Sequence, residues 1–265
     1  MTTPAGASAT RRGFGETSRT DKWWAQPLVV FLGFGFFLVY AHLRIFQNAH
    51  FEFGGYLTPF YSPLLWGDSQ HAIFQSAPEW LPRWVSPAMF ILVFPAGFRF
   101  TCYYYRGAYY KAFWADPPSC AVGEPRKGYR GENSFPLILQ NIHRYFFYAA
   151  FAFLFLLAHD AWKGMWFATA DGGAEFGIGV GTIVLTLNVC FLSLYTLGCH
   201  SLRHLIGGYL NVFSKSPARK KGWNCVTSLN ENHMKWAWVS LIWVMVSDAY
   251  VMLCANGTLT DLRIL

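Results

Sequence analysis

Long apolar stretches, separated by polar segments, dominate the chain. A helix needs about 20 consecutive, mostly apolar residues to cross the hydrocarbon core of a bilayer, and five stretches reach that length. The pattern predicts spans at residues 26–46, 84–105, 139–162, 178–213 and 234–254. Lipid offers the backbone no hydrogen-bond partner, so such spans are helical. We therefore expect an all-α, polytopic five-helix transmembrane bundle over residues 26–255.

Composition supports a membrane protein rather than a soluble one. Of the 265 residues, 54% are apolar and 19% aromatic, whereas only 13% are charged. That charged fraction is about half of the value for a soluble domain. The formal charge of +7 is explained by the loops, so we expect no nucleic-acid partner. The chain is predicted to be a multi-pass protein of the cell membrane, in contact with the lipid bilayer.

Most basic residues outside the spans fall in the segments that one side of the membrane would share. The positive-inside rule assigns that side to the cytoplasm. This predicts a cytoplasmic N-terminus, a mobile cytoplasmic tail at residues 1–25 and an outer C-terminal tail at 256–265. The cations concerned are Arg11, Arg12, Arg19, Lys22, Arg106, Lys111, Arg126, Lys127, Arg130, Lys215, Arg219, Lys220 and Lys221.

Histidines within or at the ends of the spans are the first candidates for chemistry. Ionisable groups at such positions are costly and usually face the bundle interior, so they indicate function. A helix rises about 1.5 Å per residue, which separates these histidines into two layers. The outer layer contains His42 and His159, and the inner layer contains His143, His200, His204 and His233.

Two layers of imidazole suit an electron path across a membrane, because haem iron takes axial histidines from facing helices of a bundle. A proton relay across the membrane is the alternative function of two such histidine layers. Arginines at span ends fit the haem hypothesis, since guanidinium groups pair with propionates, but snorkelling to lipid headgroups explains the same positions. These arginines are Arg44, Arg99, Arg144 and Arg203.

Cysteines of the inner layer offer a second kind of metal site. Cys102 and Cys199 are predicted at the depth of the inner histidines, whereas span two contains no histidine. Two thiolates and two imidazoles are the ligands of a Rieske-type 2Fe–2S cluster, although a buried cysteine is often only a small apolar side chain. The cluster hypothesis involves Cys102, Cys199, His143, His200 and His204.

Quinone sites need an aromatic slot and a few donors to the carbonyl oxygens. Both membrane faces offer such residues, and an aromatic belt at each interface is the structural alternative. The inner candidates are Tyr103, Tyr105, Arg106, Trp223 and Trp236, and the outer ones are Tyr56 and Tyr61.

Two carboxylates are candidates for proton transfer on the outer side. Glu52 lies in the segment between spans one and two, and Asp248 lies in the outer third of the last span. A carboxylate within a span usually has a functional role or a charged partner. Asp248 is therefore predicted either to conduct a proton or to pair with Arg44 or His42.

At this point the chain resembles the single-chain, five-span membrane anchor of succinate dehydrogenases and fumarate reductases, in particular the actinobacterial succinate dehydrogenase anchor. The resemblance covers residues 24–255. It rests on the five spans, on His42, His143 and His159, on the run GCHSLRHLIGG in span four and on the aromatic segment FEFGGYLTPFYSPL.

The resemblance implies a membrane anchor that binds a flavoprotein and an iron–sulfur subunit and passes electrons from succinate to a quinone, with menaquinone expected. His42 and His159 would hold a distal haem, and His200 or His204 would be one proximal ligand. Span two supplies Arg99 and Cys102 where di-haem members have a histidine. The inner cofactor is therefore either a haem b held by His143 and His204 or a cysteine–histidine cluster.

Other functions fit the same pattern less well. A cytochrome b subunit of another respiratory dehydrogenase is the nearest alternative, and a five-span proton-coupled transporter or scaffold is a more distant one. Transporters often contain paired repeats, and inspection of the sequence reveals no internal repeat. A higher oligomer of the complex is compatible with every one of these functions.

Overall fold

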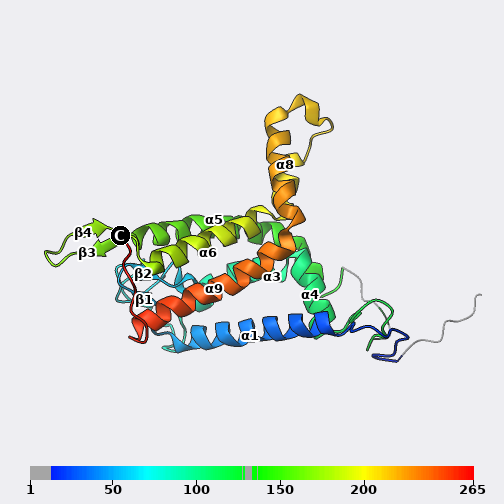
Figure 1. The fold of residues 1–265 in the computed structure, drawn as a ribbon, viewed down its shortest axis with the longest axis horizontal. Coiled ribbons are helices and arrows are strands. Elements are labelled where there is room, and N and C mark those ends of the chain that lie inside the picture. The colour runs from blue at the N-terminus through cyan, green and yellow to red at the C-terminus, as the bar shows by residue number, and fades with distance from the viewer. Residues whose placement is uncertain (1–12, 127, 129–132, 136) are drawn as a thin grey trace, which may run out of the picture. The chain divides into compact units, whose positions relative to one another are not determined.

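The computed structural model describes residues 13–126, 128, 133–135 and 137–265, and these residues are mainly helical (Figure 1). Four helical stretches are long and apolar enough to cross a membrane, and the apolar helical stretch Pro87–Phe100 is shorter. This agrees with the predicted polytopic bundle. The long stretches are α1 (Ala25–Gln47), η2 (Leu137–Ile142) with α5 (His143–Lys163), α6 (Val180–Leu197) and α9 (His233–Ala255).

Span two, predicted as one helix over 84–105, consists of shorter helices. They are α2 (Pro87–Ile91), α3 (Val93–Phe100) and α4 (Tyr103–Phe113). Pro95 has no N–H for the carbonyl of Ile91, which weakens the helix where α2 meets α3. The second break lies at Cys102, whose backbone is extended at φ −67° and ψ 135°.

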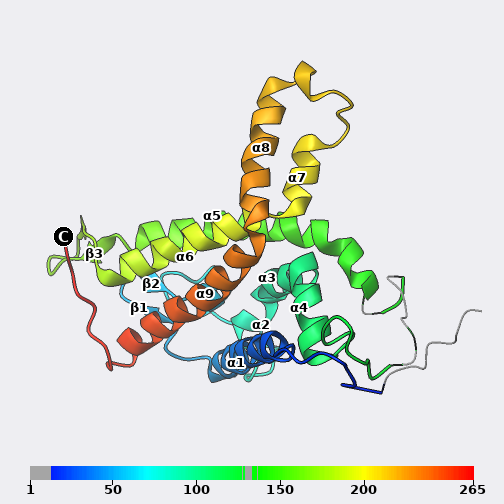
Figure 2. The ribbon, with the colours of Figure 1, turned by 45° about the vertical axis from the view of Figure 1, so that its right-hand side comes forward.

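Span four, predicted as one helix over 178–213, also breaks. α6 ends before Gly198, the backbone of Cys199 is extended, and α7 (His200–Gly207) follows. A β-carbon on Gly198 would lie 2.8 Å from the carbonyl oxygen of Leu194 and 3.2 Å from that of Leu229. Only glycine therefore allows this close approach of α8 (Pro217–Glu231). With η3 (Phe213–Lys215) between them, α7 and α8 form a hairpin that projects from the α6 and α9 helices (Figure 2).

The chain folds as two compact units, of which unit 1 comprises residues 1–36 and 102–140. In unit 1, Phe31 packs against Phe113, and Phe34 packs edge-on against Tyr105. The N–H of Gly15 donates to the carbonyl of Gly123, and the N–H of Gly123 donates to the carbonyl of Glu16. Residues 1–12 of the predicted tail lie outside the described residues, as do the topology cations Arg11, Arg12, Lys127 and Arg130.

Unit 2 comprises residues 37–101 and 141–265. Within it α6 packs against both α5 and α9, and α3 packs against α5. Two short antiparallel pairs, which the all-α prediction did not include, lie where α5 ends and α6 begins. They are β1 (Glu52–Phe53) with β2 (Tyr56–Leu57), followed by η1 (Pro59–Tyr61), and β3 (Trp166–Ala168) with β4 (Ala174–Phe176). We call this the strand end of unit 2, and the end carrying α7 and α8 the hairpin end.

A small apolar core holds the strand end together. Leu57, Phe60, Tyr61, Leu64 and Ala88 are buried there, and apolar side chains of the second half of α1 pack against them. The C-terminal residues return to the start of α6, where the N–H of Val180 donates to the carbonyl of Leu262 and that of Ile264 donates to Ile178. The segment between α1 and α2, residues 48–86, is thus folded, and we call it the cap.

Candidate metal and redox centre

A group of one cysteine and two histidines, with His143 and Cys199 buried and His200 half-buried, lies at the hairpin end. His143 is the first residue of α5, Cys199 is the N-cap of α7, and His200 is the first residue of α7. One potential ligand atom from each residue lies within 4.8 Å of the other two. Among the described residues, no other group of three or more histidine, cysteine or acidic side chains is this close. We call these three residues the His–Cys centre.

Hydrogen bonds determine which nitrogen of His143 faces the centre. The hydroxyl of Thr101 donates its hydrogen to the carbonyl of Gly97 at 2.7 Å. It therefore accepts from Nδ1 of His143 at 2.8 Å, and Nδ1 carries the proton. The lone pair is then on Nε2, which lies 3.1 Å from the sulfur of Cys199. Histidines that bind metals are usually oriented by such a bond from their second nitrogen.

The helix break at Gly198 explains why the sulfur of Cys199 faces His143. The extended backbone of Cys199 places its side chain at the N-terminus of α7, where the N–H of Ser201 donates to the sulfur at 3.4 Å. The positive end of the helix dipole favours negative charge there. Cys199 is completely buried and His143 is 4% exposed, so the centre is shielded from solvent.

Aromatic rings enclose the imidazole of His143 on both faces. Phe98 stacks on one side, with ring centroids 5.0 Å apart, and His200 stacks on the other at 5.5 Å. His204 lies one turn further along α7, exposed, with its ring edge-on to His200 at 6.0 Å. The predicted inner layer thus includes His143, Cys199 and His200 in the centre, with His204 at its margin.

The other predicted residues near this depth have different surroundings. Arg99 donates to the carbonyl of Ala237 and to the hydroxyl of Ser240, which joins α3 to α9. Arg203 donates to Thr227 within the hairpin. Arg144 is exposed. Cys102 is buried in unit 1 at the N-cap of α4 and is the next residue in the chain after Thr101.

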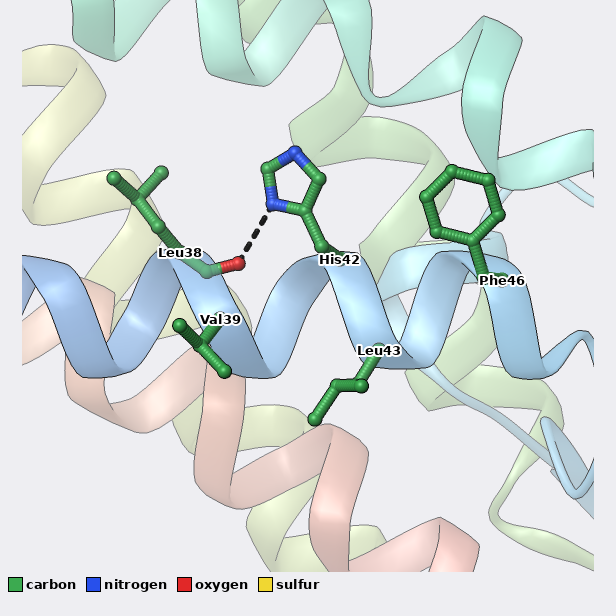
Figure 3. Close-up of a pocket in the computed structure, with 5 residues that line it drawn as sticks. All are labelled: Leu38, Val39, His42, Leu43 and Phe46. Atoms are coloured by element: carbon green, nitrogen blue, oxygen red, sulfur yellow. Dashed lines mark hydrogen bonds between the residues drawn. The ribbon is translucent and has the colours of Figure 1, made fainter.

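The outer histidines lie on the surface of unit 2. His42 is exposed, its Nδ1 contacts the carbonyl oxygen of Leu38 at 2.7 Å, and an open apolar groove on α1 surrounds it (Figure 3). The side chain of His159 is 61% exposed, with Nδ1 3.8 Å from a carboxylate oxygen of Asp160. Neither ring is enclosed by other helices of unit 2 as His143 is. The groove around His42 is lined by Leu38, Val39, Leu43 and Phe46.

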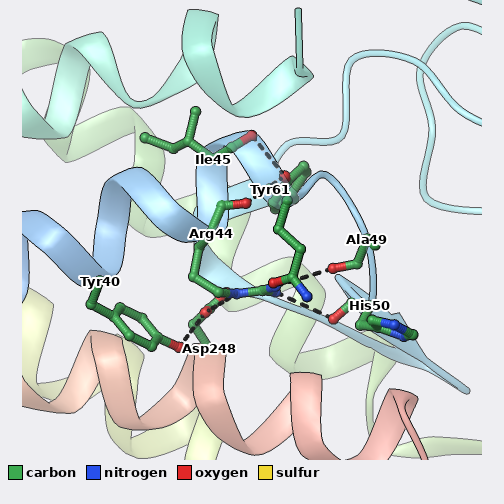
Figure 4. Close-up of polar contacts among 8 residues, drawn as sticks. Tyr40, Arg44, Ile45, Ala49, His50, Tyr61 and Asp248 are labelled. Atoms are coloured by element: carbon green, nitrogen blue, oxygen red, sulfur yellow. Dashed lines mark hydrogen bonds and ion pairs between the residues drawn. The ribbon is translucent and has the colours of Figure 1, made fainter. Parts of the chain in front are cut away.

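Asp248 is paired with Arg44, one of the two partners predicted for it. Nε of Arg44 donates to Asp248 at 2.7 Å, and the side chains are 3% and 0% exposed. The hydroxyl of Tyr40 donates to the same carboxylate at 2.6 Å. Arg44 also donates to the carbonyls of Ala49 and His50 (Figure 4). This network ties α1 and the cap to α9.

The outer tyrosines and Glu52 all lie in the cap, and each has a hydrogen-bond partner. The hydroxyl of Tyr56 donates to Asp261 at 2.8 Å, and burial raises its pKa to about 12. The hydroxyl of Tyr61 donates to the carbonyl of Arg44 at 3.1 Å. Glu52 accepts a hydrogen bond from Ser69. These groups are engaged in holding the cap.

The quinone candidates predicted on the inner side belong to different units. Tyr103, Tyr105 and Arg106 lie on α4 in unit 1, where Arg106 donates to Gln140 at 2.8 Å. Trp223 is packed inside the hairpin under the guanidinium of Arg203. Trp236 on α9 has a buried indole N–H with no acceptor among the described residues. It is therefore the donor best suited to a ligand.

Sequence reasoning missed Thr101 and Tyr40. The hydroxyl of Thr101 is hydrogen-bonded to His143, and the hydroxyl of Tyr40 is hydrogen-bonded to Asp248. Both partners were among the residues that the sequence predicted. A sequence signal exists only for Thr101. It lies four residues after Gly97, a spacing at which a threonine hydroxyl can donate to the helix backbone, and it directly precedes Cys102.

Comparisons with known proteins agree with this architecture. The family model described as actinobacterial succinate dehydrogenase subunit SdhC matches residues 25–257. A chain of the Mycobacterium smegmatis Sdh1 complex in the apo form is 44% identical, with a TM-score of 0.86 over 97% of this chain and 98% of that chain. No curated protein matches the chain. Since the family model covers nearly the whole membrane domain, the chain belongs to the actinobacterial succinate dehydrogenase subunit SdhC family.

Proposed function

We propose that this chain passes electrons to a membrane quinone through an iron centre held by His143, Cys199 and His200. As a member of its family, the chain is a membrane-anchor subunit of succinate dehydrogenase and a multi-pass protein of the cell membrane. It assembles with the flavoprotein and iron–sulfur subunits of that complex. The proposal therefore concerns how electrons cross the anchor, and the contact of Nε2 of His143 with the sulfur of Cys199 is the observation that carries it.

The donor set favours a small cluster over a haem at this centre. One thiolate and two imidazoles within 4.8 Å of one another are three of the four ligands of a Rieske-type cluster, which supplies one-electron transfer when bound. An axial pair for haem needs two nitrogens on opposite faces of a wide planar ring. Here Nε2 of His143 points at a sulfur instead.

The fourth ligand comes from the sequence prediction. Cys102 is a buried cysteine that follows Thr101 directly in the chain, and Thr101 holds His143. Cys225, which the sequence also places near this depth, is exposed. Cys102, which lies in unit 1, stays the second thiolate that the sequence predicts.

A haem b held by His42 and His159 is the alternative for the outer layer. Both side chains are on the surface of unit 2, and Nδ1 of His42 contacts its own helix. A haem at this position would require cover from outside the described fold. We therefore assign the electron path to the His–Cys centre and leave Arg99, Arg144 and Arg203 as helix-linking or surface cations rather than propionate partners.

The quinone site is proposed on the same side as the centre. The buried N–H of Trp236 can donate to a quinone carbonyl, and the cation of Lys235 lies 5.2 Å from the same indole ring. Tyr103, Tyr105 and Arg106 remain candidate quinone residues on α4. Menaquinone is the proposed substrate, and reduction of it is the part of the enzyme reaction that this subunit would perform.

Proton transfer on the outer side is assigned to Glu52 rather than to Asp248. Asp248 is fully engaged with Arg44 and Tyr40 in the strand-end network, which gives it a structural role. Glu52 accepts a hydrogen bond from the hydroxyl of Ser69 and has no ion-pair partner among the described residues. Turnover with quinone in a Glu52→Gln complex tests this assignment, and an unchanged rate would reject it.

Substitution of the ligands in the intact complex tests the iron centre. His143→Ala, His200→Ala and Cys199→Ser should each remove iron from the anchor and abolish quinone reduction, while succinate oxidation by a soluble acceptor dye continues. Cys225→Ser replaces an exposed cysteine and His204→Ala an exposed histidine, so both should retain iron. Full iron content and normal quinone reduction in the first three variants would refute the centre.

A further inference from the structure

The α7–α8 hairpin keeps its shape through its own contacts. Arg203 lies over the ring of Trp223 at 4.4 Å, and Phe213 packs on the same ring at 5.2 Å. Arg219 donates to the carbonyls of Ile206 and Gly208 at 2.8 and 2.7 Å. It thereby satisfies backbone acceptors at the C-terminal end of α7, which a helix otherwise leaves without partners. The hairpin is thus a preformed projection.

The tip of this projection carries an aromatic residue in a strained conformation. Tyr209 has φ +59°, in the left-handed region that a bulky side chain rarely adopts. Its side chain is fully exposed, so burial against the described part of the chain does not compensate for the strain. A glycine would adopt this backbone without cost. Folding of the hairpin therefore does not explain a tyrosine, and strain of this kind is often retained where a residue has a function.

Charge around the tip has one sign. Lys215, Lys220 and Lys221 are exposed on the hairpin, and Glu231 is the only acidic residue between positions 198 and 231. Val212 is also exposed. An aromatic anchor surrounded by cations fits a protein surface with an apolar pocket and an acidic rim, since tyrosine is enriched among the residues that dominate binding energy.

We propose that the α7–α8 hairpin is the docking element for the iron–sulfur subunit, with Tyr209 as its anchor. α7 begins at Cys199 and His200, and its eight residues extend about 12 Å from the His–Cys centre. A subunit bound along the hairpin would be held beside the ligands that receive its electrons. The electron-transfer consequence rests on the proposed function, whereas the docking itself rests on membership of the complex.

A single glycine substitution separates docking from a structural role. In the intact complex Tyr209→Gly should raise the dissociation constant of the soluble subunits about tenfold, the effect of losing a binding anchor. Tyr209→Phe should restore most of the affinity. Trp80→Ala is the matched control, because Trp80 is an exposed aromatic residue far from the hairpin in the chain. Unchanged affinity in Tyr209→Gly, with a more stable anchor, would overturn the proposal.

Two further measurements distinguish docking of the iron–sulfur subunit from lipid binding and from a defect in the iron centre. The affinity is compared in nanodiscs of zwitterionic and of anionic lipid, and a Tyr209→Gly effect confined to anionic lipid would show that the tip binds headgroups, which overturns the proposal. Iron in the anchor is measured in the same preparations. Tyr209→Gly should keep its iron and bind the soluble subunits about tenfold more weakly, whereas His143→Ala should lose iron and bind them with unchanged affinity. Failure of either result alone therefore identifies which of the two proposals is wrong.

Discussion

Unit 2 contains a buried polar cluster at each end, and the two differ in charge. At the strand end, Arg44 and Asp248 neutralise each other, and Tyr40 and backbone carbonyls take the remaining bonds. At the hairpin end, the His–Cys centre brings together groups that offer lone pairs, with Nε2 of His143 directed at the sulfur of Cys199. The first cluster is complete without a ligand, whereas the second combines atoms that typically bind iron.

This difference separates structural from chemical roles among intramembrane polar residues. Both clusters are buried, so burial alone does not indicate function. A charged group that is fully paired holds helices together, and removing one partner leaves an uncompensated charge. Neutral donors converging on one point have less reason to be buried together unless something binds between them. Substitutions at the strand-end cluster should therefore change stability, whereas substitutions at the His–Cys centre should change iron binding.

Breaking the ion pair should destabilise the anchor most. Asp248→Asn leaves the guanidinium of Arg44 buried without its counter-charge, at an expected cost of about 3–5 kcal/mol in the free energy of unfolding. Thermal unfolding of the detergent-purified complex measures the loss. The double substitution Arg44→Met with Asp248→Asn should recover much of it, because no unpaired charge remains.

Asp171→Asn is the matched control, since Asp171 is an exposed aspartate in the β3–β4 loop. It should leave the unfolding temperature unchanged. If Asp248→Asn instead kept full stability and slowed quinone turnover, Asp248 would be a proton carrier, and the strand-end cluster would not be structural.

A smaller effect is expected from Thr101, which acts on the centre through His143. Thr101→Val keeps the side-chain shape but removes the acceptor for Nδ1–H of His143. Loss of such an orienting bond usually weakens metal binding about 10- to 100-fold. Iron retention during dialysis against a chelator measures this loss, and Thr101→Ser should restore it. Equal retention in the valine variant would show that the bond does not position a ligand.

The smallest effect concerns pH at the strand end. Both ring nitrogens of His71 are buried without a hydrogen-bond partner in the described structure, and burial lowers its pKa below the ordinary 6.5. Asp160 and Glu52 favour the charged ring, while Lys163 and His159 oppose it. Below pH 6.5 the unfolded chain binds this proton more readily than the folded one, so stability of the cap should fall as pH decreases.

Hydrogen exchange of the cap amides at pH 7.5 and 5.5 measures this change. His71→Gln should make protection of the cap less dependent on pH, since the glutamine does not titrate. The same pH dependence in the variant would mean that another group is responsible.

Much of the fold followed from the sequence because lipid imposes simple rules. Four spans and the helical class follow from apolar length alone. The breaks at Leu92 and Cys199 did not, since the apolar pattern continues through them while Pro95 and Gly198 alter only the backbone. The short strands of the cap were missed because their residues alternate too briefly for a period to be visible.

The sequence predicted which residue types form the candidate site, but not which of them lie close together. Depth along the helices placed His143, Cys199 and His200 in one layer, and the structure brings these three together. Depth gives no information about which way a ring faces; His42 and His159 are on the surface of unit 2, and their role as a haem pair stays a prediction. The pairing of Asp248 with Arg44 was one of the predicted alternatives, because an intramembrane charge needs a partner.

Low-temperature EPR of the dithionite-reduced, intact complex is the most direct test of the His–Cys centre. We expect a two-iron signal of Rieske type in addition to those of the soluble subunits, lost in Cys199→Ser and kept in Cys225→Ser. An optical haem α band without that signal, or a spectrum identical in both variants, would contradict it.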